Sequence, residues 1–347
     1  MILITGGTGY IGKNIALHLL LKGEIVYLLD NFSNSSPSAY HTLKDIMKEK
    51  NIPENNLHIS ILNLSCTKDI NVWLNNNYIF AKKTFNLPPI SAIIHCAGHK
   101  SVPESINNPL EYYKNNLMST INIIELTKQL NIENTKAKSP PVPIIFSSSI
   151  TVYGNVYNIH EQMICNLQAI TSPYGKTKLI NEEILKDSSK DVKTVSLRYF
   201  NPIGCYYKLD EEITEKSTNI IPSLIKSIRN NTPFNVYGND YPTRDGTCIR
   251  DYIDVRDLAE AHYLAIKFAN KMESNFQIIN LGTNNGTSVK ELLDTFEKMK
   301  RIKIKYNIKE RRQGDSASSV SNSVKAQELL NWKPVYRIED SVSTIFL

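Results

Sequence analysis

Apolar and polar positions follow a repeating order through the first two hundred residues. Short apolar runs bounded by polar residues are typical of strands covered on both faces. Such runs lie at 2–5, 25–29, 57–63, 92–97 and 144–149. Helical spacing lies between them, most clearly at 109–130, while 75–89 is polar and 131–143 has the composition of a loose surface insertion. Strands that alternate with helices predict an α/β fold with a doubly wound parallel sheet.

The pattern loosens beyond about residue 200. Helical spacing returns at 220–229, at 255–268 and near Ile338, and a strand-like run lies at 276–282. Ser288 and Glu291 have the spacing of a capping box, which predicts the start of a further helix. We therefore expect a first domain at 1–202 and a smaller mixed α/β domain at 203–347. The helix within 250–270 is expected to return to the first domain.

A glycine-rich turn joins the first predicted strand to the first predicted helix. Gly7, Gly9 and Gly12 have the G-x-G-x-x-G spacing of a Rossmann-type dinucleotide site. Glycine allows the tight turn and the close approach of a pyrophosphate to the helix N-terminus. Asp30 ends the next strand, eighteen residues past Gly12. A carboxylate there can accept hydrogen bonds from both ribose hydroxyls and repel a 2′-phosphate, which favours NAD over NADP.

Polar residues follow the other predicted strands as well. Beyond the glycine turn and Asp30, the strand ends are Asn63, 98–100, 147–149 and 199–204. Parallel sheets bind their ligands beyond the carboxyl ends of the strands. These residues are therefore expected to converge on one edge of the sheet.

A tyrosine and a lysine share one face of a predicted helix. Ser172 and Pro173 suit the cap and first turn, so Tyr174 opens the helix and Lys178 lies one turn further on. An ammonium within reach lowers a tyrosine pKa by roughly 1–3 units, which would give a usable base. The same spacing also arises by chance on surface helices. The catalytic interpretation of Tyr174 and Lys178 therefore depends on the serine run at 147–149 and on the cofactor turn.

Composition narrows the function classes. The chain has 347 residues, of which 41% are hydrophobic and 21% charged, with a net charge of +6. We find no basic run interleaved with aromatics, which argues against nucleic-acid binding. No apolar stretch approaches the ~20 residues that span a membrane. The five cysteines show no spacing for a metal or a disulfide, and Met1 leads directly into a strand, so we expect a cytoplasmic protein without a metal.

Longer motifs give the chain a family resemblance from Ile2 to about Trp332. It resembles the extended short-chain dehydrogenase/reductases and, within them, the UDP-glucose 4-epimerase family. The most discriminating run is Tyr237-Gly-Asn-Asp-Tyr-Pro-Thr243 with Asp245-Gly-Thr247 and Arg250-Asp-Tyr252. Other matching runs are Thr5–Gly12, Leu29–Asn31, Pro109–Tyr113, Phe146–Ser149, Thr151–Gly154, Ser172–Lys178 and Leu197–Pro202.

The resemblance implies an isomerase that interconverts UDP-glucose and UDP-galactose by inverting C4 through a 4-keto intermediate. Tyr174 would take the proton of the sugar 4-hydroxyl while tightly bound NAD accepts hydride from C4. Lys178 would lower the tyrosine pKa, and Ser149 would bind the 4-hydroxyl. The resemblance also implies a homodimer in which the helices at 109–130 and 173–186 pair.

The resemblance further implies two sets of binding residues. The cofactor set is Gly6, Gly9, Tyr10, Ile11, Gly12, Asp30, Asn31, Phe32, Ser33, Asn34, Ser35, Asn63, Leu64, Cys96, Ala97, Gly98, Lys100, Asn115, Ser147, Tyr174, Lys178 and Phe200. The UDP-sugar set is Ser149, Tyr174, Asn201, Asn219, Ile220, Asn235, Val236, Tyr237, Arg250, Arg312, Asp315 and Ser319. Two arginines suit a diphosphate, because a guanidinium binds phosphate oxygens through paired hydrogen bonds.

The sequence departs from the family pattern in three places. Asn63 stands where an aspartate usually faces adenine, so we expect weaker NAD binding. Ser319 stands where a tyrosine often limits the sugar pocket, which leaves room for the 2-acetamido group of UDP-GlcNAc or UDP-GalNAc. The C-terminus, which ends at Leu347, is several helical turns shorter than the family pattern.

Three other functions fit the same fold. A 4,6-dehydratase needs an acid–base pair just after Ser149, where this chain has Ile150 and Thr151. A UDP-glucuronate 4-epimerase stays open, because no motif identifies the substituent at C6. A non-catalytic NAD-binding sensor would be expected to lack an intact tyrosine, lysine and serine set.

Overall fold

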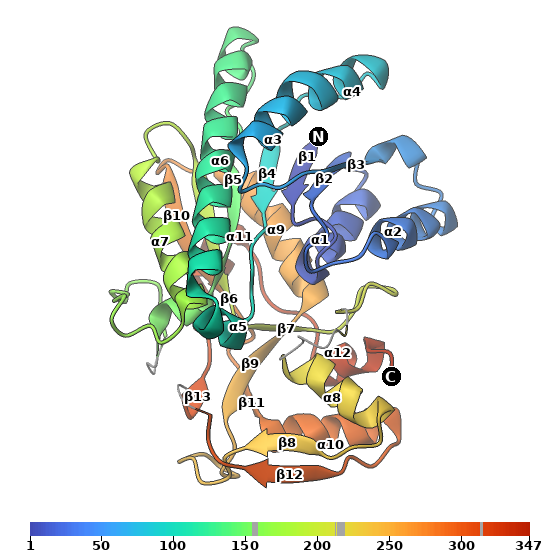
Figure 1. Ribbon diagram of the computed structural model, residues 1–347, viewed down its shortest axis with the longest axis vertical. Helices are drawn as coiled ribbons and strands as arrows, with labels where there is room; N and C mark the ends of the chain where they lie inside the picture. Colours follow the sequence, from blue (N-terminus) through green and yellow to red (C-terminus); the bar gives the residue numbers. More distant parts are fainter. Residues whose placement is uncertain (155–158, 212, 214–218, 313–314) are drawn as a thin grey trace.

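The computed structural model describes residues 1–347 apart from 155–158, 212, 214–218 and 313–314. A parallel sheet of seven strands forms its centre, in the order β10-β6-β5-β4-β1-β2-β3 (Figure 1). The strands are β1 Ile2–Thr5, β2 Val26–Asp30, β3 Leu57–Ile61, β4 Ala92–His95, β5 Ile144–Ser149, β6 Thr194–Tyr199 and β10 Phe276–Leu281. The predicted α/β fold and the predicted parallel sheet are confirmed.

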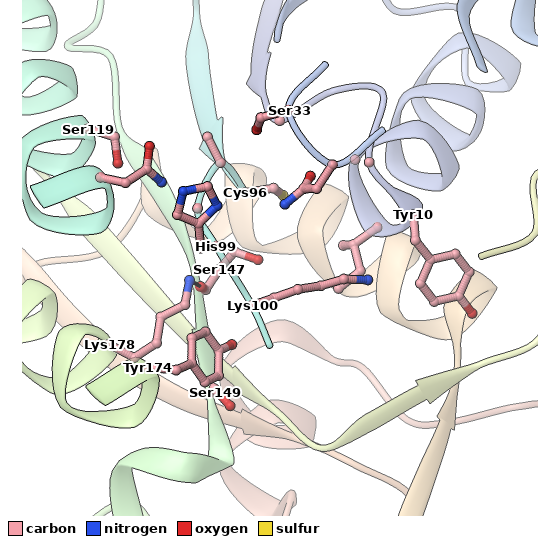
Figure 2. A pocket seen from close by; sticks show the side chains of 18 of the residues that line it. Tyr10, Ser33, Cys96, His99, Lys100, Ser119, Ser147, Ser149, Tyr174 and Lys178 are labelled. Atoms are coloured by element: carbon pink, nitrogen blue, oxygen red, sulfur yellow. Dashed lines mark hydrogen bonds between the residues drawn. The ribbon is translucent and has the colours of Figure 1, made fainter. Parts of the chain in front are cut away.

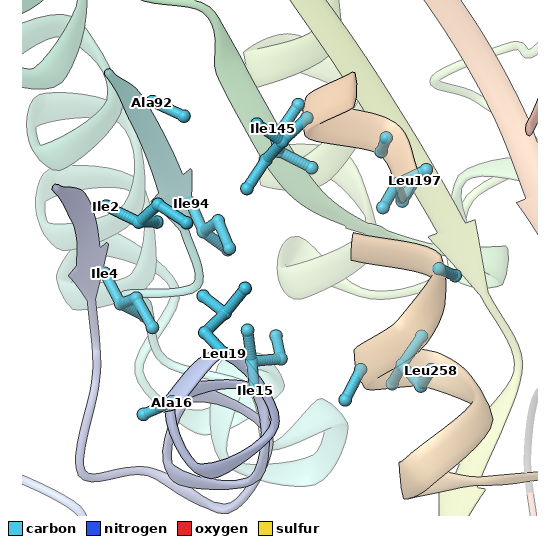
Figure 3. Packing of buried hydrophobic residues seen from close by; sticks show 14 of the residues in the cluster. Ile2, Ile4, Ile15, Ala16, Leu19, Ala92, Ile94, Ile145, Leu197 and Leu258 are labelled. Carbon is cyan, nitrogen blue, oxygen red and sulfur yellow. The ribbon is translucent and has the colours of Figure 1, made fainter. Parts of the chain in front are cut away.

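Neighbouring residues of a strand point to opposite faces of the sheet, so these apolar strands present apolar side chains on both faces. Helices cover each face. Ile2 and Ile4 pack on the face shown in Figure 3, where Ile15 and Leu258 approach them from two helices. Leu3, between them in sequence, belongs to the apolar cluster of the other face. The first face carries α1 Tyr10–Leu21, α2 Ser38–Glu49, α9 Val255–Ala269 and α11 Val324–Leu330. The second carries α3 Thr67–Val72, α4 Ile79–Thr84, α6 Pro109–Lys136 and α7 Pro173–Asp187.

A smaller layer of strands and helices lies beyond one edge of the main sheet (Figure 1). Its strands are β7 Asn201–Ile203, β8 Phe234–Tyr237, β9 Ile249–Asp254, β11 Gly286–Ser288, β12 Tyr306–Lys309 and β13 Ser318–Ser319. Its helices are α8 Ile220–Arg229, α10 Val289–Lys300 and α12 Ile338–Thr344, which share one apolar cluster. The predicted capping box is present, with Ser288 and Glu291 each bonding the other's backbone N–H. The division at residue 202 stays a prediction.

One segment differs from the sequence-based expectation, and a second has a structure that the sequence left open. The stretch 131–143 is not a loose insertion throughout, because α6 continues to Lys136 and Asn131 Oδ1 accepts a 2.6 Å hydrogen bond from Val142 N. The polar stretch 75–89 is largely helical, since Trp73–Tyr78 forms a π-helix that runs into α4. Trp73 and Tyr78 are buried and stack on each other, so two aromatic anchors hold an otherwise polar segment.

Short segments complete the chain: the 3-10 turns Glu54–Asn56 and Ile150–Tyr153, and α5 Val102–Asn107. No described helix is both long enough and apolar enough to cross a membrane.

Candidate active site

Tyr174 and Lys178 lie in the first turns of α7, as predicted. Ser172 caps this helix, and its hydroxyl accepts a 3.1 Å hydrogen bond from Gly175 N. The Lys178 side chain is buried, and its Nζ donates a 2.6 Å hydrogen bond to the Ser147 carbonyl oxygen. The ammonium is 4.8 Å from the centre of the Phe146 ring and 5.9 Å from that of Tyr174. Strand β5 therefore fixes the lysine beside the tyrosine.

Ser149 ends β5 on the same side of the site (Figure 2). Its oxygen accepts hydrogen bonds from Thr151 N at 3.2 Å and from Thr151 Oγ1 at 3.0 Å. Ser149 also acts on Tyr174, because its hydroxyl opposes the rise in the tyrosine pKa that burial causes. Ser149, Tyr174 and Lys178 line one cavity of about 280 Å³. The structure thus brings the three predicted catalytic side chains together.

The sequence predicted that Lys178 lowers the pKa of Tyr174. This prediction is wrong for the protein without bound NAD. Burial raises the pKa of Tyr174 to about 12, and the Ser149 hydroxyl only partly opposes this effect. Burial also lowers the pKa of Lys178 to about 8. The lysine ammonium points to the Ser147 carbonyl rather than to the phenol oxygen, so desolvation outweighs its influence on Tyr174.

The glycine turn forms the other end of the cavity. Gly6 adopts a φ of 64°, and a Cβ there would lie 2.8 Å from Ala97 N. A Cβ on Gly12 would lie 2.2 Å from the Gly6 carbonyl oxygen, so a side chain cannot fit at that position. The turn leads into the N-terminus of α1, where unpaired backbone N–H groups favour an anion. This cradle fits the pyrophosphate of a dinucleotide.

Asp30 closes the adenosine side of this cradle. Its carboxylate is buried and accepts hydrogen bonds from Thr8 N at 3.0 Å and from Phe32 N at 2.9 Å. These bonds hold the carboxylate at the end of β2, where a ribose would lie. Asn63 also lines the cavity, but its amide oxygen already accepts two hydrogen bonds from Ser65. The expected bond from that oxygen to adenine therefore competes with a local turn.

Most predicted cofactor residues line this one cavity. They are Gly6, Gly9, Tyr10, Ile11, Gly12, Asp30, Asn31, Ser33, Asn34, Asn63, Leu64, Cys96, Ala97, Gly98, Lys100, Asn115, Ser147, Tyr174, Lys178 and Phe200. Phe32 and Ser35 are outside that lining and instead hydrogen-bond to Asp30. The Tyr10 hydroxyl donates a 2.7 Å hydrogen bond to the Gly204 carbonyl oxygen, so the side chain is committed to packing.

Three cavity residues, His99, Tyr199 and Pro202, belong to the strand ends that the sequence predicted to converge here. Six further residues line the cavity without having been predicted, namely Leu62, Val102, Ser119, Ile150, Thr151 and Glu211. Most are neighbours of predicted strand ends, so a wider window around each strand end would have found them. Glu211 belongs to a polar loop with no motif, and no sequence signal indicates its place.

The predicted substrate residues fall into two groups. Asn201 and Asn219 line the cavity beside Ser149 and Tyr174. Outside that lining, Asp315 lies 3.5 Å from Arg250 Nη2 and accepts a 2.9 Å hydrogen bond from Arg312 Nε. The Arg312 guanidinium also stacks on the Tyr237 ring at 4.8 Å.

Ile220 directly follows Asn219 of the cavity, and the other predicted substrate residues lie near the second group. Ser319 pairs with Arg250 between β13 and β9, and Ile220 begins α8. On β8, Val236 is buried while Asn235 is exposed.

Comparisons with known proteins agree with this geometry. The family model described as GDP-mannose 4,6-dehydratase matches residues 3–345. A bifunctional UDP-glucose 4-epimerase and UDP-xylose 4-epimerase of Pisum sativum is 37% identical over 98% of this chain and 92% of its own length. A UDP-glucose 4-epimerase of Schizosaccharomyces pombe is 37% identical over 96% of this chain and 89% of its own.

Solved structures give the same result. The UDP-glucose 4-epimerase of Bifidobacterium longum, in complex with NAD⁺ and UDP, has a TM-score of 0.80 and 34% identity. That of Stenotrophomonas maltophila, with bound NAD and formylated UDP-arabinopyranose, has a TM-score of 0.83 and 30% identity. Each alignment covers 99% of this chain and 96% of the other.

A dinucleotide cradle on a parallel sheet, with a serine, tyrosine and lysine at its far end, defines the class of extended short-chain dehydrogenase/reductases. Within this class, the chain belongs to the UDP-glucose 4-epimerase family. The family resemblance inferred from the motifs is therefore confirmed.

Proposed function

We propose that this protein interconverts UDP-glucose and UDP-galactose by inverting the C4 centre, with a resident NAD. One observation carries the proposal: Ser149, Tyr174 and Lys178 meet in the same cavity as the glycine cradle and Asp30. A sugar at the catalytic end would have its 4-hydroxyl beside a phenol and its diphosphate toward Asn219. NAD and UDP, named in the Bifidobacterium longum complex, support the two ligands.

NAD, when bound, supplies the hydride acceptor and, in its oxidised form, a positive charge near the phenol. Tyr174 takes the proton of the 4-hydroxyl, and Ser149 holds that hydroxyl by a hydrogen bond. Lys178 is fixed by Ser147, and its ammonium would favour the phenolate form of the tyrosine together with the positive charge of bound NAD. When the 4-keto sugar presents its other face, Tyr174 returns the proton to the oxygen at C4.

The rival activities differ at two positions. Dehydration would need an acid–base pair after Ser149, but Ile150 and Thr151 carry no carboxyl group, and the Thr151 hydroxyl is bound to Ser149. UDP-glucuronate 4-epimerase activity stays an alternative, because the described lining of the cavity does not identify a residue that selects the substituent at C6 of the sugar. Turnover of UDP-glucuronate that exceeds that of UDP-galactose would favour this alternative.

We also propose that N-acetylated UDP-sugars are substrates, since Ser319 is small. A UDP-Glc/GlcNAc 4-epimerase of Campylobacter jejuni, 29% identical with a TM-score of 0.76, supports this breadth within the family. Conversion of UDP-GalNAc to UDP-GlcNAc by the purified protein is the expected result. If no conversion occurs at saturating UDP-GalNAc, this part of the proposal fails.

We propose a cytoplasmic homodimer. The five cysteines are free, which suits a reducing compartment. Helix α6 exposes Leu110, Met118 and Ile121, with exposures of 72%, 38% and 36%, and a second copy could cover these side chains. Sedimentation equilibrium would detect the dimer, and Leu110→Lys would be expected to weaken it.

The decisive test uses Tyr174→Phe. Wild-type protein should convert UDP-galactose to UDP-glucose without added NAD, whereas Tyr174→Phe should lose about 10²–10⁴-fold in kcat, the usual contribution of a positioned acid–base group. Tyr306→Phe, on exposed β12, is the matched control and should keep full activity.

If the wild-type protein is silent, NAD is added to the same reaction. Rescue by NAD would identify a loosened adenine site, with Asn63 as the first residue to change to Asp. Silence with NAD present, or full activity of Tyr174→Phe, would contradict the proposed function.

A further inference from the structure

Glu211 places a carboxylate inside the cavity where nucleotide phosphates are expected. Its Oε1 accepts a 2.6 Å hydrogen bond from Lys100 Nζ and a 2.9 Å hydrogen bond from Asn219 Nδ2. The glutamate side chain is only 11% exposed, although it is charged and lies in a loop. One oxygen of a largely buried side chain therefore holds two donors, on the exposed residues Lys100 and Asn219, which belong to different segments of the chain.

The contact between Glu211 and Lys100 involves two of the few charged side chains around the cavity. Among the described residues that line it, the charged side chains are Asp30, Lys100, Lys178 and Glu211. Lys178 is committed to the Ser147 carbonyl at the catalytic end. Lys100 instead extends across the cavity toward the side of Tyr10 and α1 (Figure 2). Lys100 is therefore the cation placed to bind a phosphate at the glycine cradle. Its ammonium is instead hydrogen-bonded to the Glu211 carboxylate.

Asn219 stands in the same position toward the second ligand, the UDP-sugar. It lines the cavity near the predicted sugar end, and its amide donor would suit an oxygen of the substrate diphosphate. That donor is bonded to the same Glu211 oxygen that holds Lys100. A carboxylate oxygen and a phosphate oxygen accept hydrogen bonds from the same donors, and two anions at one ammonium repel each other.

We propose that Glu211 is an internal competitor of the nucleotide phosphates. The carboxylate takes the place of a phosphate oxygen on Lys100 and Asn219 and must release both when dinucleotide and sugar nucleotide bind. Each ligand therefore binds more weakly than its own contacts would allow. The inference rests on the proposed function for the identity of the two ligands.

The test compares Glu211→Gln with the wild-type protein. Glutamine keeps the size of the side chain and removes the charge that competes with phosphate. We expect UDP, titrated into NAD-saturated protein in a calorimeter, to bind roughly tenfold more tightly, which is the lower range for a hydrogen bond to a charged group. NAD release, followed by gel filtration and quantification of the retained nucleotide, should slow by a similar factor.

Two further variants separate competition from a general change in charge. Asp210→Asn removes the neighbouring negative charge, whose carboxyl interacts with Lys13 instead, and should leave UDP affinity within twofold of wild type. Lys100→Met should speed NAD release. In the Lys100→Met background, Glu211→Gln should no longer slow that release, because the contested ammonium is gone.

The outcomes separate this inference from the proposed function. If Glu211→Gln leaves both affinities unchanged, or weakens them because the carboxylate orients Lys100, the inference is overturned and the proposed function stands. If the effect on NAD release persists without Lys100, competition for that ammonium is also overturned. If wild-type protein binds neither UDP nor NAD, both fail together.

Discussion

Tyr174 has the neighbours that a base needs, but they do not overcome the rise in its pKa that burial causes. Burial raises this pKa to about 12, and the Lys178 ammonium is bonded to a carbonyl. We therefore predict that nucleotide-free protein shows no ionisation of Tyr174 between about pH 7 and pH 10, below its raised pKa. The measurement is the absorbance at the phenolate band, taken as the difference between wild type and Tyr174→Phe.

Added NAD should move this ionisation to lower pH, because a positive nicotinamide ring favours the phenolate. Lys178→Met with NAD should move it back upward and serves as the matched variant. A phenolate signal near neutral pH without NAD would contradict the prediction and would mean that Lys178 alone activates the tyrosine.

Single residues differed in how far the sequence could place them. Gly12 and Asp30 were predictable because a local spacing sets both their backbone geometry and their position at a strand end. The Tyr10 side chain was not, since its hydroxyl bonds to Gly204, nearly two hundred residues away in sequence. Glu211 was not predictable either, because its partners Lys100 and Asn219 meet it only through the fold.

At the scale of elements, a buried ion pair attaches the catalytic helix α7 to strand β6. Arg198 Nε donates to both Glu182 oxygens, at 2.9 and 3.1 Å, and both side chains are almost fully buried. Ser148 and Ser196 also donate to Glu182 Oε1. Glu182 lies one turn beyond Lys178, so the pair sets the position of the catalytic face of the helix.

We predict that Glu182→Gln lowers the free energy of unfolding by about 3–5 kcal/mol, because it leaves the Arg198 charge buried without its counter-ion. Urea denaturation measures this loss. The double variant Glu182→Leu with Arg198→Met should recover most of it, since it removes both charges and keeps apolar volume. A double variant as unstable as Glu182→Gln would show that the serine hydrogen bonds, not the ion pair, hold the helix.

Whole elements were predictable where their pattern is long and periodic, but not all of their ends were. The spacing located α8 at its observed bounds and α6 from its first residue. It missed the part of α6 beyond residue 130, where Thr135 Oγ1 donates to the Asn131 carbonyl oxygen and Asn131 Oδ1 accepts from Val142 N. It also missed β8 and β12, whose four-residue pairing leaves no alternation long enough to read.

For the whole molecule, the sequence predicted a parallel sheet but not the order of its strands. Strand β10, from Phe276 to Leu281, completes the sheet by pairing with β6. This pairing joins segments about eighty residues apart, and local periodicity contains no information on which strands become neighbours. The same limit applies to the cavity, whose two ends come from residues near 10 and near 174.

Two buried histidines make the stability of the whole fold depend on pH. His95 Nδ1 lies 2.7 Å from the Thr5 hydroxyl, which accepts from Ala97 N, and this ring nitrogen is the one acceptor for the Thr5 proton among the described residues, so the hydroxyl donates to the ring. His95 Nε2 lies 3.1 Å from Thr120 Oγ1, whose own proton goes to the Asn116 carbonyl, so Nε2 donates. This directed chain fits a neutral ring and has no place for a second proton.

Burial lowers the pKa of His95 to about 3 and that of His262 to about 4. His262 is likewise held neutral, because Nδ1 bonds to the Leu258 carbonyl oxygen and Nε2 has no hydrogen-bond partner among the described residues. The unfolded chain binds protons at these rings below about pH 6.5 while the folded chain does not. Their contribution to stability is therefore complete above that pH and is lost as the pH falls toward the folded values.

We predict that each ring lowers the free energy of unfolding by about 2 kcal/mol between pH 7 and pH 5. Urea denaturation at both pH values tests this, with His95→Asn and His262→Asn each expected to reduce the loss by that amount. Asp257, whose pKa burial raises to about 6, acts in the opposite direction in all variants and cancels from the comparison. If the pH dependence of His95→Asn equals that of wild type, His95 accepts a proton within the fold, and the directed chain from Thr5 to Asn116 is wrong.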